Sequence, residues 1–61
     1  MPHLFTLMAK LTAEERQKLG ERRRELKARD GVQERLVEAR KGEWQLEYWR
    51  AKEKIETIPL L

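Results

Sequence analysis

The chain has 61 residues, of which 39% are hydrophobic and 41% charged, and its formal net charge is +3. This length allows one domain, 1–61, and excludes a catalytic domain joined to a regulatory one. Scaffolds this small bury only about 60% of the surface that the unfolded chain exposes, and they usually need disulfides, a metal or a partner subunit. The sequence has no cysteine and a single histidine. We therefore expect no metal centre and no cofactor, and we expect the chain to associate with itself.

The composition also bears on the growth temperature and the cell compartment to which the protein is suited. Serine and asparagine are absent, whereas glutamate and arginine are abundant, which resembles the composition of thermophile proteins. No stretch approaches the ~20 consecutive apolar residues of a transmembrane helix, and nothing resembles a signal peptide. We expect a cytoplasmic protein without a transmembrane segment.

The first element, residues 1–11, is an apolar arm. Leu4, Leu7, Met8 and Leu11 lie at i, i+3, i+4 and i+7, which is the spacing of a helix with one apolar face. The pattern predicts a short helix or an ordered arm that packs on the rest of the chain.

The second element is a helix over residues 12–29. Thr12 and Glu15 have the spacing of a capping box, in which each side chain bonds the backbone N–H of the other residue. Asp30-Gly31 follows a basic last turn and predicts the end of this helix.

The third element is predicted as a second helix over residues 32–57, which Pro59 prevents from continuing. Val37, Trp44, Ala51 and Ile58 repeat every seven residues, as in a coiled coil. These elements predict an all-α fold, a helical hairpin that associates into an antiparallel bundle as a homodimer or homotetramer. The expected oligomer core consists of Leu19, Leu26, Val37, Trp44, Tyr48 and Ile55.

An alternative arrangement follows from the glycines. Gly20, Gly31 and Gly42 are eleven residues apart, and an eleven-residue period is compatible with one nearly straight helix over residues 12–57. The hairpin is preferred because Asp-Gly is a strong turn signal.

The basic run in 12–29 is the first candidate site. Arg22, Arg23, Arg24 and Lys27 could neutralise phosphates of a nucleic acid. The simpler interpretation is a solvated helix face, because glutamates lie three or four residues from several of these cations. Binding of nucleic acid through this helix is therefore the alternative function.

The second candidate site is a patch of Leu46, Trp49 and Arg50 that the predicted seam leaves free. Aromatic and arginine side chains are enriched at binding hot spots. Catalysis is disfavoured, because serine and cysteine nucleophiles are absent and no metal-ligand spacing occurs. We expect a non-catalytic interaction module, an adaptor, regulator or inhibitor that docks on a larger protein or acts by forming oligomers.

Overall fold

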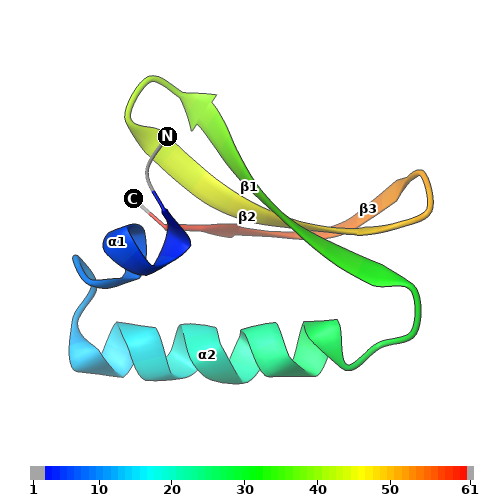
Figure 1. The fold of residues 1–61 in the computed structure, drawn as a ribbon, viewed down its shortest axis with the longest axis horizontal. Coiled ribbons are helices and arrows are strands. Elements are labelled where there is room, and N and C mark those ends of the chain that lie inside the picture. The colour runs from blue at the N-terminus through cyan, green and yellow to red at the C-terminus, as the bar shows by residue number, and fades with distance from the viewer. Residues whose placement is uncertain (1–2, 61) are drawn as a thin grey trace.

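The computed structural model describes residues 3–60 and has an α+β fold. Two helices, α1 (Leu4–Met8) and α2 (Ala13–Lys27), precede three strands, β1 (Val32–Arg40), β2 (Glu43–Arg50) and β3 (Glu53–Pro59). The strands form one antiparallel sheet in the order β1-β2-β3, and α2 runs beneath it (Figure 1).

The prediction of an all-α fold is wrong. Residues 32–57 form the sheet instead of a helix, which also excludes the helical hairpin, the coiled coil, the antiparallel helical bundle and the continuous rod over 12–57. The inward-facing residues of β2 recur every second position, because Trp44, Leu46 and Tyr48 alternate with polar or exposed positions along the strand. The seven-residue repeat joins residues that lie on different strands and in a turn.

Tight turns connect the elements that follow α2. Gly31 and Gly42 have φ angles of 77° and 80°, a left-handed conformation that glycine adopts without steric cost. Gly31 lies between α2 and β1, so Asp30-Gly31 is a turn as the sequence predicts. Gly42 lies in the turn of the hairpin between β1 and β2, whereas the sequence predicts a helix at this position.

Helix α2 begins with the predicted capping box. The Glu15 N–H donates to the Thr12 hydroxyl at 3.1 Å, and the Thr12 N–H donates to the Glu15 carboxylate at 2.8 Å. These two bonds satisfy amides that lack partners within the helix, and they hold the pKa of Glu15 below its ordinary value.

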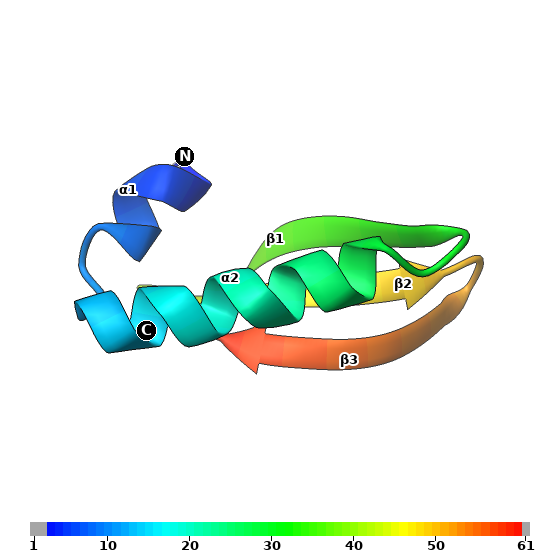
Figure 2. The same cartoon turned by 90° about the horizontal axis from the view of Figure 1, so that it is seen from below.

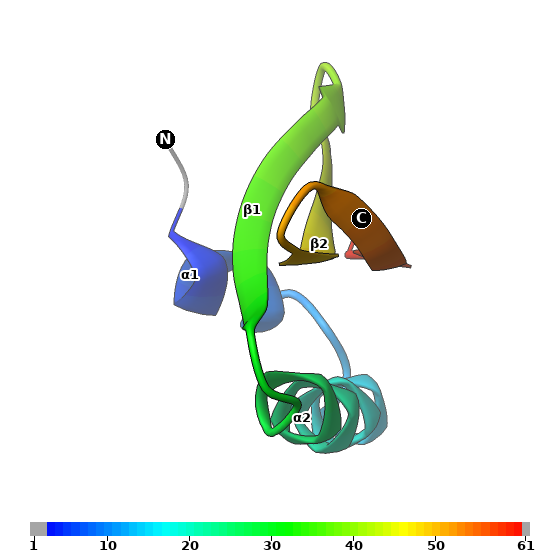
Figure 3. The same ribbon diagram turned by 90° about the vertical axis from the view of Figure 1, so that its right-hand side faces the viewer.

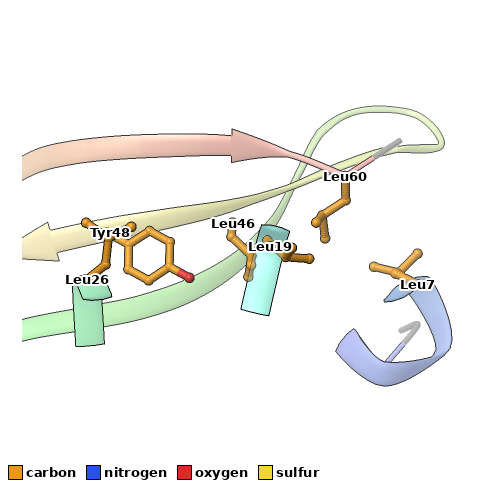
Figure 4. Close-up of a cluster of buried hydrophobic side chains, with 6 residues drawn as sticks. All are labelled: Leu7, Leu19, Leu26, Leu46, Tyr48 and Leu60. Carbon is orange, nitrogen blue, oxygen red and sulfur yellow. The ribbon is translucent and has the colours of Figure 1, made fainter. Parts of the chain in front are cut away.

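The core lies between α2 and the sheet, and α1 closes one end of it (Figure 4). Leu19 and Leu26 face the sheet from α2, whereas Leu46 and Tyr48 face the helix from the central strand. The buried set is Leu7, Leu19, Leu26, Leu46, Tyr48 and Leu60. Phe5 on α1 remains 66% exposed.

Arginine–glutamate ion pairs connect α2 to both outer strands, on either side of the leucine row that Leu19 and Leu26 form. Figure 2 shows α2 lying over β2 with β1 and β3 on its two sides. Arg23 donates two hydrogen bonds to Glu34 on β1, at 2.8 and 2.9 Å. On the other side, Arg22 makes a bidentate pair with Glu56 on β3.

Glu34 also accepts a hydrogen bond of 2.5 Å from the hydroxyl of the buried Tyr48. The bonds from Arg23 and Tyr48 lower the pKa of Glu34 despite its burial. Burial and the negative Glu34 raise the pKa of Tyr48. Glu34, Tyr48 and Glu56 form one row across the three strands. The polar side chains between α2 and the sheet therefore find their hydrogen-bond partners within this interface.

Candidate functional site

The face of the sheet opposite α2 is uncovered (Figure 3), and Trp49 is the aromatic residue on it. Strand pairing places Trp49 opposite Gln33 of β1 and Lys54 of β3. The guanidinium carbon of Arg35 and the ammonium nitrogen of Lys54 each lie 5.9 Å from the centre of the indole ring. Both distances are within the range in which a cation is attracted to an aromatic ring.

The polar edge of Trp49 is already bonded within the sheet. Its indole N–H donates to Glu47 at 3.0 Å, and Gln45 donates to the same carboxylate at 3.1 Å. These hydrogen bonds and the nearby Lys54 hold the pKa of Glu47 below its ordinary value. Trp49 therefore offers a partner its ring surface rather than a free donor.

An open hollow borders Trp49 at the end of the sheet where β2 turns into β3. Its volume is about 320 Å³, at the lower end of the ~300–1,000 Å³ range of small-ligand pockets. The lining residues are Gln33, Arg35, Trp49, Ala51 and Lys52. Ala51 has a φ of 53°, a left-handed conformation that is uncommon for residues other than glycine.

The cations around this hollow outnumber the carboxylates that pair with them. Arg35 and Lys52 are exposed, and neither forms an ion pair within residues 3–60. Lys54 lies 3.5 Å from Glu47. Two positive charges therefore remain free to meet an anion beside the aromatic ring.

The structure does not bring Leu46, Trp49 and Arg50 together on one surface. Leu46 is completely buried against α2, and Trp49 lies on the opposite face. Arg50 pairs with Val32 at the end of the sheet and packs beside Gly31. Trp49 alone is on the open face.

The basic run of α2 divides between two environments. Arg22 and Arg23 are bound to Glu56 and Glu34. Arg24 and Lys27 remain exposed, although Lys27 approaches Glu34 to 3.9 Å. A shallow hollow beside them is lined by Gly20, Arg23, Arg24, Lys27 and Ala28, and it contains no aromatic residue.

The residues of the expected oligomer core lie in different parts of the fold. Leu19, Leu26 and Tyr48 are buried within the single chain. Trp44 and Ile55 are partly buried against the same core, and Val37 lies across from Gln45 on the open side of the sheet.

Arg35 and Lys54 were not identified from the sequence as site residues. They are fourteen and five residues from Trp49 and reach it only through strand pairing. The alternation in Glu43–Arg50 is the signal that could have revealed the open face, because it puts Gln45, Glu47 and Trp49 together. It does not show which residues of the other strands join them.

The described chain contains neither a cluster of metal ligands nor a membrane-spanning helix. No group of three His, Asp or Glu side chains within residues 3–60 could hold a metal ion. Neither α1 nor α2 is long and apolar enough to cross a membrane. Comparisons with protein-family models, curated proteins and solved structures find no match for this chain.

Proposed function

We propose that this chain is a small, non-catalytic binding protein that docks an anionic partner on the open face of its sheet. The observation that carries the proposal is Trp49, which stands on this face between Arg35 and Lys54. A sheet face with an aromatic anchor and an arginine that forms no ion pair within residues 3–60 has the residue types of binding hot spots. This proposal retains Trp49 from the sequence analysis and replaces Leu46 and Arg50 with Arg35 and Lys54.

The arginine-rich helix supports this function less well. Arg22 and Arg23 already bond carboxylates of the sheet, so an anion would have to compete with these pairs. The carboxylates that it displaced would then be left partly buried without a partner, which is costly.

The test is to map the contact surface with heparin as a polyanionic probe, using amide chemical shifts of the labelled protein. We expect the largest shifts at Gln33, Arg35 and Trp49, because they border the hollow. Arg35→Gln should weaken heparin binding more than Arg16→Gln, which removes the same charge from an exposed position on α2. Shifts centred on Arg24 and Lys27 would contradict the proposal and favour the helix.

A further inference from the structure

We propose that the anionic partner is a single-stranded nucleic acid, with one base stacked on Trp49 and the flanking phosphates held by Arg35 and Lys52. This inference rests on the proposed function, because it assigns the partner of the same surface. Proteins that bind single strands combine aromatic stacking with cations that follow the backbone. The hollow of Gln33, Arg35, Trp49, Ala51 and Lys52 provides both kinds of group.

The first argument concerns what Trp49 can offer. Its indole N–H is bonded to Glu47, so what this half-buried side chain can still offer a partner is its π surface, beside which Arg35 and Lys54 lie. A carboxylate on an acidic protein gains nothing from that surface. A nucleotide base is planar and can stack on it, while its phosphate meets the neighbouring cations.

The second argument concerns space beside the ring. The guanidinium of Arg35 is 5.9 Å from the ring centre, and no carboxylate of the described chain fixes it there. An exposed side chain without an ion pair can swing aside at small cost. A base can then lie on Trp49, and the planar guanidinium can cover it or bond its phosphate.

The third argument distinguishes single strands from duplexes. In a duplex the base faces are stacked on each other and cannot contact an aromatic side chain. The alternative basic surface on α2 has Arg24 and Lys27 but no aromatic residue in its hollow. The combination of ring and cations therefore occurs at the sheet, and it suits unpaired bases.

The experiment compares a short oligothymidylate, a duplex of the same length and heparin. With Trp44→Phe, Trp49 becomes the single indole of the chain, so stacking should quench its fluorescence. Trp49→Leu should weaken oligothymidylate binding by about tenfold and leave heparin binding unchanged, while Trp49→Phe should retain most of the affinity. For two or three phosphate contacts, the plot of log K against log[salt] should have a slope of about −1.4 to −2.1.

The outcomes separate this inference from the proposed function. If Arg35→Gln weakens oligothymidylate binding but Trp49→Leu and Trp49→Phe do not, base stacking is wrong and only the anionic docking surface remains. Equal affinity for the duplex would also overturn the inference. If neither heparin nor oligothymidylate shifts the resonances of the open face, both proposals fail.

Discussion

Glu34 links helix and sheet at the scale of single residues. Its carboxylate receives two hydrogen bonds from Arg23 and one from Tyr48, and its side chain is only 14% exposed. A neutral amide at this position cannot accept all three bonds, because an amide has one oxygen. The half-buried guanidinium would then lose its counter-charge.

We therefore expect Glu34→Gln to lower the free energy of unfolding by about 1–3 kcal/mol. Urea denaturation at pH 7 measures this change. Glu21→Gln is the matched control, because Glu21 is exposed on α2 and forms no ion pair within residues 3–60. Equal stability of the two variants would show that the pair with Arg23 contributes nothing.

The same residue predicts a pH dependence. The folded-state pKa of Glu34 lies below its ordinary value of 4.5, so its contribution is complete above that value and is lost as the pH falls through the folded pKa. The pKa of Glu56 is also lowered, by Arg22. Between pH 7 and pH 3 the natural sequence should lose more stability than the Glu34→Gln variant.

At the scale of elements, Gly20 in α2 and Gly31 in a turn should respond oppositely to replacement by alanine. Gly20 lies within α2, and a methyl group added there would meet no atom within 4 Å. Gly20→Ala should therefore stabilise the protein by about 0.5–1 kcal/mol. Gly31→Ala should destabilise it by about 1–2 kcal/mol, because a side chain at a φ of 77° is strained. Thermal unfolding of both variants measures whether the two changes in stability have opposite signs. Stabilisation by Gly31→Ala would contradict the left-handed conformation of this turn.

The elements differ in how well the sequence predicts them. Helix α2 carries local signals at both ends, the capping box of Thr12 and Glu15 and the turn at Asp30-Gly31. The strands are rich in glutamate, lysine and arginine, which favour helices, and this composition masked the alternation in β2. The β-branched and aromatic residues from Val32 to Ile58 were a strand signal that the seven-residue repeat obscured.

The candidate site was predictable only in part for the same reason. Trp49 stands out by residue type, whereas Arg35 and Lys54 join it through the register of two strand pairs. Register depends on which face of each strand is buried. A helix over residues 32–57 has no strand faces, so the sequence prediction leaves this register undetermined.

At the scale of the whole molecule, the core remains small. The chain exposes 4673 Å², more than the ~4,200 Å² expected of a compact monomer of its mass. Self-association thus stays a prediction that rests on the small size of the chain, now without the helical bundle as the form that it would take. Light scattering over a range of concentrations measures the mass; we expect it to rise above 7.4 kDa, and a constant monomer mass would contradict this expectation.

The ion pairs between α2 and the sheet allow the positive and negative charges to be exchanged between the two elements. Arg22 and Arg23 flank the leucine row and meet Glu56 and Glu34 on opposite strands. A helix with two glutamates would fit a sheet with two arginines if Glu25 and Lys27, which pair with Arg22 and Glu34, also changed the sign of their charge, since the Tyr48 hydroxyl can accept as well as donate. Mixed combinations would place like charges together. If the helix and the sheet were made as two separate peptides, each charge pattern on the helix would thus bind only the complementary sheet. The two matched pairs could then serve side by side in a split reporter.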